Sequence, residues 1–289
     1  MKGTHLLLRV VVTVPFLLGA AAGVPDATDE VAFRFTDRDI VESSGLVAVD
    51  GLVVTTNDSG DSGRVFAVDP STGATVGVTR WATDPEDVEA LAPAGPGRVW
   101  VADIGDNQHA RASVSVLRVP VGRGDRDVVP EAYELVYPDG ARDAEALLSH
   151  PVTGQLFLVT KGVFAGTVYA APQRLRPDGP NRLTEVGQAP GLVTDATFLP
   201  GGGGVVMRTY TAAHLSAFPS WQGVESWELP DQDQGEGVAL AGDELLVSTE
   251  GARSQVLRVG LPASAGATDL LSPAWTSLRW LATAYARPL

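Results

Sequence analysis

The stretch Asn57–Arg64, NDSGDSGR, places Ser62 between an aspartate and a glycine, a setting in which a serine can act as a nucleophile. Such chemistry also needs a histidine base, an acid that orients it and an oxyanion hole. The histidines after residue 23 are His109, His150 and His214, and they stand in unrelated sequence contexts. The stretch falls at the same place in an internal repeat as DIGDNQHAR, residues 103–111. We therefore interpret Ser62 as part of a loop between strands, and not as the nucleophile of a serine protease.

These two loops share a second kind of chemistry, because both are rich in Asp and Asn. The matching side chains are Asn57, Asp58 and Asp61 in the first loop and Asp103, Asp106 and Asn107 in the second. Asp and Asn side chains cap turns and tolerate left-handed backbone. Their oxygens are also ligands for a hard cation such as Ca²⁺, although the spacing is not that of an EF-hand loop. Both interpretations stay open at this point.

An acidic residue opens each of five similar segments of the chain. These residues are Glu42, Glu89, Glu145, Asp195 and Glu236, and they recur every 41 to 56 residues. Each is followed by a short apolar run, a tight turn, a second apolar run, a polar loop and a third run, and a fourth candidate strand lies between repeats. Four antiparallel strands repeated every 40–50 residues are typical of β-propeller blades.

The sequence thus predicts an all-β fold, a propeller of five blades with four strands each, in a single domain over residues 31–289. The run VAFRF, Val31–Phe35, is expected to close the ring as the fourth strand of the last blade, which removes an open sheet edge. The tail Ala263–Leu289 either covers one face or contributes to a sixth blade, which is the alternative count.

In a propeller, the loop before each inner strand and the loop after each second strand open on the same face. The opening acids should therefore surround the channel mouth together with the ends of the second strands. Those ends carry Asp58, Asp103, Lys161, Arg208 with Tyr210, and Glu250. Neighbouring carboxylates repel by about 2–4 kcal/mol per pair at an intermediate dielectric, so they must be separated, protonated, hydrogen-bonded or bridged by a cation.

A group of carboxylates in this arrangement predicts a Ca²⁺ site in or near the channel. The candidate metal ligands are Glu42, Asp58, Glu89, Asp103, Asp195 and Glu250. In the alternative interpretation, the recurring acids accept backbone amides and hold neighbouring blades together. Lys161, Arg208 and Tyr210 break the acidic pattern and are candidates for binding a small anion, with arginine able to bind it in bidentate fashion. Equally, Lys161 and Arg208 can form rim salt bridges with Glu145 and its neighbours.

The N-terminus and the composition bear on location. Residues 1–23 combine Lys2 and Arg9 with an apolar run and a small-residue end, the pattern of a signal peptide. We expect a secreted, monomeric protein with no membrane attachment after cleavage. The chain has no cysteine, and its net charge of −14 at pH 7 disfavours binding to nucleic acid.

The motifs ESSGL, NDSGDSGR, VADIGDN, DAEALL and QGEGVAL together resemble those of a family of secreted bacterial, largely actinobacterial, β-propeller proteins. This resemblance covers Glu42 to about Val259 and implies the fold and export. DQGEGVALAGDELLVSTEG, from Asp233, is more loosely similar to a blade of the β-propeller phytases, which are calcium-dependent; Glu236 and Glu250 are the matching acids. Propeller lactonases are a further analogue, in which Glu42, Asn57, Asn107 and Asp195 would take the calcium-binding roles.

The leading hypothesis is a secreted propeller whose acidic face binds Ca²⁺ and a small anionic ligand. As an enzyme it would be a metal-dependent hydrolase, with a phosphoester preferred over a lactone as substrate. Glu145 or Glu236 would then position the metal or activate water, and Lys161, Arg208 and Tyr210 would bind the anion. The alternative is a non-catalytic module that binds an extracellular protein or glycan through the same face.

Overall fold

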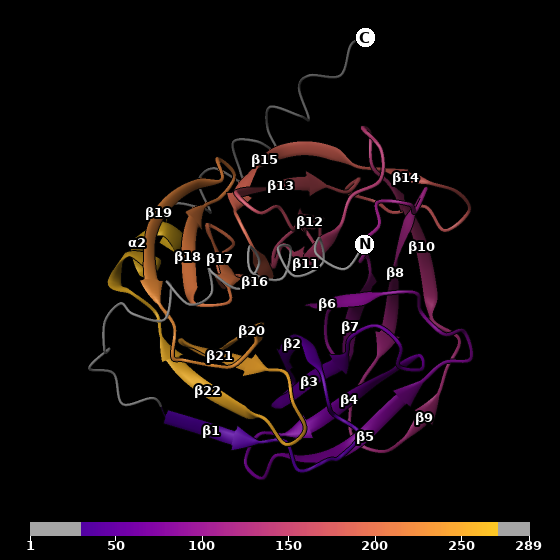
Figure 1. Cartoon of the computed structure of the whole chain (residues 1–289), viewed down its shortest axis with the longest axis vertical. Coiled ribbons are helices and arrows are strands. Elements are labelled where there is room, and N and C mark those ends of the chain that lie inside the picture. Colours follow the sequence, from indigo (N-terminus) through magenta and orange to yellow (C-terminus); the bar gives the residue numbers. More distant parts are fainter. Residues whose placement is uncertain (1–29, 271–289) are drawn as a thin grey trace, which may run out of the picture.

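The computed structural model describes residues 30–270, which form five β-sheets around a central axis (Figure 1). The inner strands are β2 (Ser43–Val49), β6 (Val88–Pro93), β11 (Ala144–Ser149), β16 (Val193–Phe198) and β20 (Gly235–Ala241). Each inner strand contacts the next one in chain order, and β2 contacts β20. The ring is therefore closed, and the prediction of a five-bladed propeller is confirmed.

Each blade continues outward in antiparallel steps. The second strands are β3 (Leu52–Asn57), β7 (Arg98–Asp103), β12 (Leu156–Thr160), β17 (Gly204–Thr209) and β21 (Glu244–Thr249). The third strands are β4 (Arg64–Asp69), β8 (Val114–Pro120), β13 (Ala165–Ala170), β18 (Ala212–Ala217) and β22 (Gln255–Gly260). The outer strands are β5 (Ala74–Arg80), β10 (Glu131–Val136), β15 (Thr184–Pro190), β19 (Gln222–Glu228) and β1 (Glu30–Arg34). Blades 1 to 5 are numbered here by their inner strands, from β2 to β20.

The N-terminal strand β1 closes the ring, because it pairs antiparallel with β22 as the outer strand of blade 5. Phe33 of β1 is buried, and its ring packs edge-on against Phe35 with centroids 5.5 Å apart. Both belong to a cluster that also contains Leu46 and Phe66 of blade 1 and Val256 of blade 5. The closing strand is thus joined to two blades by apolar packing as well as by its hydrogen bonds.

Three short elements complete the described chain. The strands β9 (Arg126–Asp127) and β14 (Asn181–Arg182) add parallel edges to blades 1 and 2. The helix α2 (Ala263–Leu270) contacts β17, and Ala265 is buried against blades 4 and 5. No sixth sheet is present within residues 30–270. The expected signal peptide, residues 1–23, and the tail beyond residue 270 lie outside the described residues.

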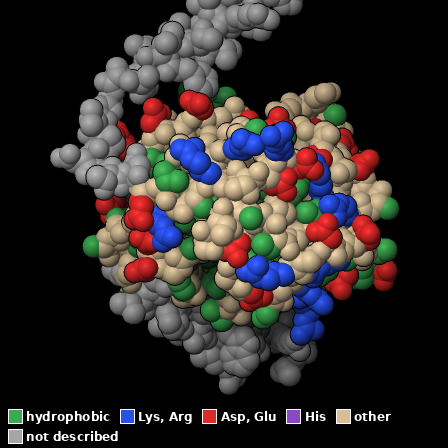
Figure 2. All heavy atoms as spheres, turned by 90° about the horizontal axis from the view of Figure 1, so that it is seen from below, with side chains coloured by type: hydrophobic (Ala, Val, Ile, Leu, Met, Phe, Trp, Pro, Cys, Tyr) green, Lys and Arg blue, Asp and Glu red, His purple; other side chains and the backbone are tan. Residues whose placement is uncertain are grey.

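The edge of the disc at blades 5 and 1 carries arginines interspersed with acidic groups (Figure 2). Exposed ion pairs in these blades include Arg80 with Asp125 at 3.1 Å and Arg258 with Glu244 at 3.4 Å. Pairs of this kind contribute about 0–1 kcal/mol each. The stability of the disc therefore comes mainly from the five apolar clusters within and between its blades.

All five inner strands are interrupted at the same place. The register with the second strand shifts one residue after the strand begins, for example between Val88 and Ala90 and between Ala144 and Ala146. Corresponding shifts occur in β2, β16 and β20. A β-bulge leaves a residue outside the ladder and re-aims its side chain. This recurring bulge determines which residues face the channel mouth.

Candidate functional site

The bulged positions are equivalent in the five blades. They hold Ser44, Glu89, Glu145, Thr194 and Glu236. Three of the five opening acids predicted from the sequence therefore occupy matching positions. In blade 1 the matching residue is Ser44, two positions after Glu42, and in blade 4 it is Thr194, one position before Asp195.

Ser44 and Thr194 join neighbouring blades. The Ser44 hydroxyl donates to the carbonyl oxygen of Glu89 at 2.8 Å, and the Thr194 hydroxyl donates to that of Glu236 at 3.0 Å. At the recurring position, these two hydroxyls therefore link neighbouring blades. Glu89 and Glu236 accept these bonds through their backbone carbonyl oxygens, so their carboxylates are not used in these links.

A second set of acids lies two residues before the bulge, where the chain reaches each inner strand. It comprises Glu42, Asp87 and Asp143 in blades 1, 2 and 3. Asp87 is partly buried, and Asp143 is buried and accepts a hydrogen bond from the Asp106 amide at 2.8 Å. Neither Asp87 nor Asp143 is among the site residues predicted from the sequence. The signal that would have found them is the repeated pattern Asp-X-Glu-Ala-Leu at residues 87–91 and 143–147.

Asp58, Asp87 and Glu89 form the tightest group of carboxylates in the described residues. One oxygen from each lies within 4.8 Å of the others, which is a geometry able to hold a metal ion. Burial, together with the charges of Asp58 and Asp143, raises the pKa of Asp87 to about 6. Burial and the neighbouring Glu145, Asp58 and Asp87 raise the pKa of Glu89 well above its usual range. A cation bound at this position would offset the repulsion between these carboxylates, which contributes to the raised pKa values.

Gly105 provides the space for this group. A Cβ atom at Gly105 would lie 2.4 Å from Oδ2 of Asp87 and 2.6 Å from Oε1 of Glu89, so any other residue here would displace one of these carboxylates. The backbone amides of Ile104 and Gly105 also donate to the carbonyl oxygen of Asp87 at 3.0 and 3.1 Å. The glycine of the DIGDN loop thus lets the backbone approach these two carboxylates closely.

Blades 3 and 4 bring Glu145, Lys161 and Tyr210 to the same channel, with Glu145 near Glu89. Nζ of Lys161 lies 2.8 Å from Oε1 of Glu145 and 5.8 Å from the centre of the Tyr210 ring. The pKa of Glu145 is nevertheless raised, because burial outweighs the effect of the lysine. Burial and the charge of Glu145 raise the pKa of Glu236 to about 8. The channel therefore contains carboxyl groups that can exchange a proton near neutral pH.

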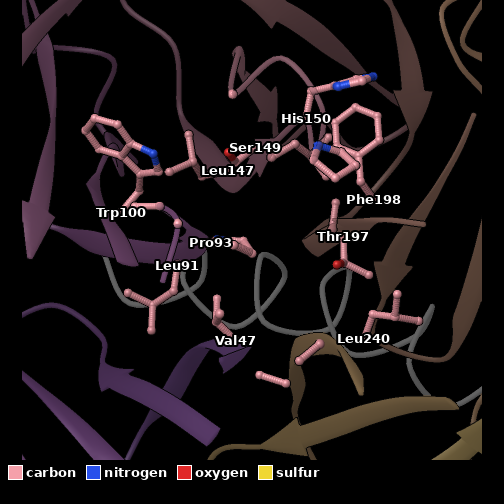
Figure 3. A pocket seen from close by; sticks show the side chains of 18 of the residues that line it. Val47, Leu91, Pro93, Trp100, Leu147, Ser149, His150, Thr197, Phe198 and Leu240 are labelled. Carbon is pink, nitrogen blue, oxygen red and sulfur yellow. The ribbon is translucent and has the colours of Figure 1, made fainter. Parts of the chain in front are cut away.

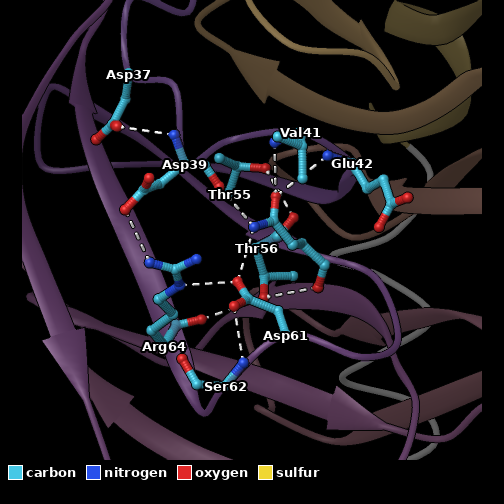
Figure 4. Close-up of polar contacts among 10 residues, drawn as sticks. Asp37, Asp39, Val41, Glu42, Thr55, Thr56, Asp61, Ser62 and Arg64 are labelled. Atoms are coloured by element: carbon cyan, nitrogen blue, oxygen red, sulfur yellow. Dashed lines mark hydrogen bonds and ion pairs between the residues drawn. The ribbon is translucent and has the colours of Figure 1, made fainter.

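Glu250 and Glu42 lie further out on the same mouth. Glu42 is exposed, and its carboxylate extends away from the loop network beside it (Figure 4). Burial raises the pKa of Glu250, and the charges of Asp58 and Glu42 raise it further. These three carboxylates are therefore near enough to interact, and the acidic group continues from blade 2 across blade 1 to blade 5.

Asp103 and Asn57 are turn caps rather than channel residues. The Asp103 carboxylate accepts the amides of Glu86 and Asp87 at 3.2 and 3.0 Å, and pairs with Arg111 at 2.8 Å. Asn57 accepts the amides of Val41 and Glu42 in the same way, at 3.0 and 3.2 Å. Both side chains fix the chain as it reaches the inner strand. They position the neighbouring acids and are themselves occupied.

Asp195 and Arg208 lie in the wall between blades 4 and 5, away from the mouth where the sequence placed them. The Asp195 carboxylate accepts the amides of Ala196 and Val238, both at 2.8 Å. The fully buried Arg208 guanidinium donates to the carbonyl oxygens of Gly237 and Ser248 at 2.6 and 2.7 Å. Asp195 and Arg208 thus join blades 4 and 5, as expected if the recurring acids hold neighbouring blades together.

The NDSGDSGR loop is a structural network (Figure 4). The Asn57 amide donates to Asp61 at 2.7 Å, and Arg64 pairs with Asp61 at 2.8 Å. Burial opposes ionisation of Asp61, but the bonds from Arg64 and Asn57 prevail and lower its pKa. Ser62 is exposed and its amide donates to Asp61 at 2.7 Å. The loop therefore presents Asp58 to the mouth and uses Asp61 to hold its own shape.

A cavity of about 650 Å³ lies at the other end of the inner strands (Figure 3). Its lining includes Leu46, Leu91, Leu147, Phe198 and Leu240, so every blade contributes. The channel is thus polar where the inner strands begin and apolar where they end. The cluster of carboxyl groups and Lys161 lie at the polar end, while Arg118, Ser149 and His150 also line the cavity.

Comparison with solved structures finds matches to three enzymes. A gluconolactonase of Xanthomonas campestris matches with a TM-score of 0.47 and 14% identity, covering 83% of this chain and 99% of that one. The glutaminyl cyclase of Myxococcus xanthus matches with a TM-score of 0.49 and 13% identity, over 81% and 100%. A glucose dehydrogenase matches with a TM-score of 0.47 and 12% identity, over 82% and 100%.

The five-bladed propeller is shown by the strand pairing within the five sheets and by the contacts between neighbouring inner strands. No protein-family model and no curated protein sequence matches the chain. Over residues 30–270, no helix has the length and apolar character needed to cross a bilayer.

Proposed function

We propose that the channel mouth binds a divalent cation through Asp58, Asp87 and Glu89, and that this cation is Ca²⁺. The observation that carries the proposal is the convergence of these three carboxylates within 4.8 Å around a glycine that makes room for them. Carboxylate oxygens are the ligands that Ca²⁺ prefers, and its coordination number of six to eight leaves positions for water or a ligand. Binding would release the protons that the raised pKa values of Asp87 and Glu89 retain.

We further propose that the site hydrolyses a small anionic phosphoester. A bound Ca²⁺ would supply positive charge to stabilise the anion and lower the pKa of water. Lys161, whose Nζ lies 5.8 Å from the centre of the Tyr210 ring, would bind an anionic oxygen together with Tyr210. Glu145 and Glu236 are the candidate bases, because a carboxylate whose pKa lies near neutrality accepts a proton efficiently at physiological pH. Arg208 has no part in this step, since backbone carbonyls occupy its guanidinium.

One observation favours a second candidate, a non-catalytic propeller that binds an extracellular partner through the same mouth. Lys161 is already paired with Glu145 at 2.8 Å, which reduces its availability to an anion. In this case the mouth would bind Ca²⁺ and no phosphoester would be turned over. Action outside the cell is part of both proposals, and its support is the signal-like pattern of residues 1–23.

The test is calorimetric titration of Ca²⁺ into the metal-free protein, followed by an assay with p-nitrophenyl phosphate. We expect Glu89→Gln to weaken Ca²⁺ binding by at least tenfold, because it removes one charged ligand. Glu134→Gln is the matched control, since Glu134 is an exposed glutamate on the outer strand β10. Undetectable Ca²⁺ binding by the wild-type protein would end the metal proposal. Binding without hydrolysis would select the non-catalytic candidate.

A further inference from the structure

The channel mouth is divided into two unlike halves. Blades 5, 1 and 2 present carboxylates at its outer level, which are Glu250, Glu42, Asp58 and Asp87. Blades 3 and 4 present Lys161 and Tyr210 instead, with apolar side chains in the adjoining loops. Val163 and Phe164, two and three residues after Lys161, are 71% and 95% exposed, and Leu192 is 38% exposed.

The apolar side chains belong to two loops that are fixed to each other. The amide of Leu192, before β16, donates to the carbonyl oxygen of Gly162 at 2.8 Å. A Cβ atom on Gly191 would lie 2.6 Å from the carbonyl oxygen of Val163, so the two loops are in direct contact. Val163, Phe164 and Leu192 thus form one surface beside Lys161, called here the apolar rim.

The conformation of Leu192 supports a role for this surface. Its φ is +58°, a left-handed conformation that non-glycine residues seldom adopt and that costs on the order of 1–3 kcal/mol. Folding alone would be served better by glycine or asparagine at this position. The chain instead keeps a large apolar side chain in a strained, partly exposed position next to the only lysine of the described residues.

We propose that the apolar rim binds the nonpolar part of the substrate, so that the substrate is a phosphoester of an aromatic or alkyl alcohol. This inference rests on the proposed function, because it needs an anionic group held at the mouth. Lys161 is a single cation beside many acids, and a molecule with several phosphates would face Glu250 and Glu42 with its additional charges. A singly phosphorylated molecule with an apolar group avoids that repulsion and covers Phe164.

The experiment compares the affinities of phenylphosphonate and methylphosphonate in saturating Ca²⁺, by calorimetry. These probes share the anionic group and differ in the apolar one, and they report binding without turnover. We expect the wild-type protein to bind phenylphosphonate about tenfold more tightly, the effect of removing some 50–60 Å² of apolar surface from water. Phe164→Ser should reduce this preference to about twofold. Val129→Ser, at a 98% exposed valine in another loop, should leave it unchanged.

The outcomes separate the two proposals. Equal affinity of the wild-type protein for both phosphonates, or a preference that survives Phe164→Ser, would overturn the role of the apolar rim and leave the anion site standing. Failure of both phosphonates to bind, with Ca²⁺ bound, would overturn anion binding at the mouth and this inference with it. Loss of methylphosphonate binding in Phe164→Ser would also count against the rim, because its effect should be confined to the apolar group.

Discussion

At the scale of single residues, similar side chains perform different tasks according to where the bulge places them. Glu89 and Asp195 both open a repeat in the sequence, yet Glu89 faces the channel and Asp195 binds two backbone amides inside a wall. The difference is one position relative to the bulge, which exchanges the face of the strand that a side chain occupies. Arg208 lies in the same wall because it is paired directly with Asp195 between β16 and β17.

Replacing Arg208 with methionine should destabilise the protein without removing the metal site. The substitution leaves the carbonyl oxygens of Gly237 and Ser248 without their donor and the Asp195 carboxylate without a nearby cation. We expect the free energy of unfolding in urea to fall by about 3–5 kcal/mol, the usual effect of breaking a buried ionic network. Arg258→Met, at an exposed pair with Glu244, should change it by less than about 1 kcal/mol. Ca²⁺ affinity of the folded variant should remain within threefold of wild type; a larger loss would place Arg208 in the site.

At the scale of elements, the first strand of the fold completes the last blade. Without β1, the edge of β22 would be open and the apolar cluster shared by blades 5 and 1 would lose Phe33. The channel geometry depends on this closure, because Glu250 and Glu42 meet across the boundary between the same two blades.

Phe33→Ala tests the closure. Removing a buried phenyl ring leaves a cavity, and we expect unfolding in urea to require about 3–5 kcal/mol less free energy. Val31→Ala is the matched change in the same strand, where the side chain is 43% exposed, and should have a small effect. Equal effects of the two substitutions would mean that β1 contributes little to holding the ring together.

At the scale of the whole molecule, the buried carboxyl groups make the stability of the protein depend on pH and on bound metal. Burial raises the pKa of Glu236 to about 8, and that of Glu89 is raised further, so the folded protein retains protons that the unfolded chain releases above pH 4.5. The folded state then binds more protons than the unfolded state, and the free energy of unfolding decreases as pH rises. Burial lowers the pKa values of His150 and of the partly buried His214, and this contribution makes the free energy of unfolding rise with pH only below about pH 7.

Between pH 7 and pH 9 we therefore expect the Tm of the metal-free protein to fall. Saturating Ca²⁺ should raise the Tm, and the increase should be larger at pH 9 because fewer protons must be displaced. At a concentration 100 times Kd the stabilisation is about 2.7 kcal/mol, or roughly 5–10 °C for a domain of this size. Scanning calorimetry with and without chelator measures both effects. A metal-free Tm that rises over this interval would contradict the assignment of raised carboxyl pKa values.

The sequence by itself determined the architecture. Repeated apolar runs at blade spacing predicted five sheets, and VAFRF predicted the closing strand, because strand number and pairing order follow from local patterns. It also placed Glu89, Glu145, Glu236 and Lys161 on one mouth. The repeated Asp-X-Glu-Ala-Leu pattern held the information on Asp87 and Asp143, which only the structure made apparent.

Tertiary structure alone decided which acids converge. The β-bulges were not predicted from the sequence. In blades 1 and 4, the residues at the bulge are Ser44 and Thr194, and not the predicted acids Glu42 and Asp195. It also decided that Arg208 is enclosed and that Phe164 is exposed. The physical reason is that orientation toward the channel depends on register between strands, and register is set by cross-strand packing over the whole ring.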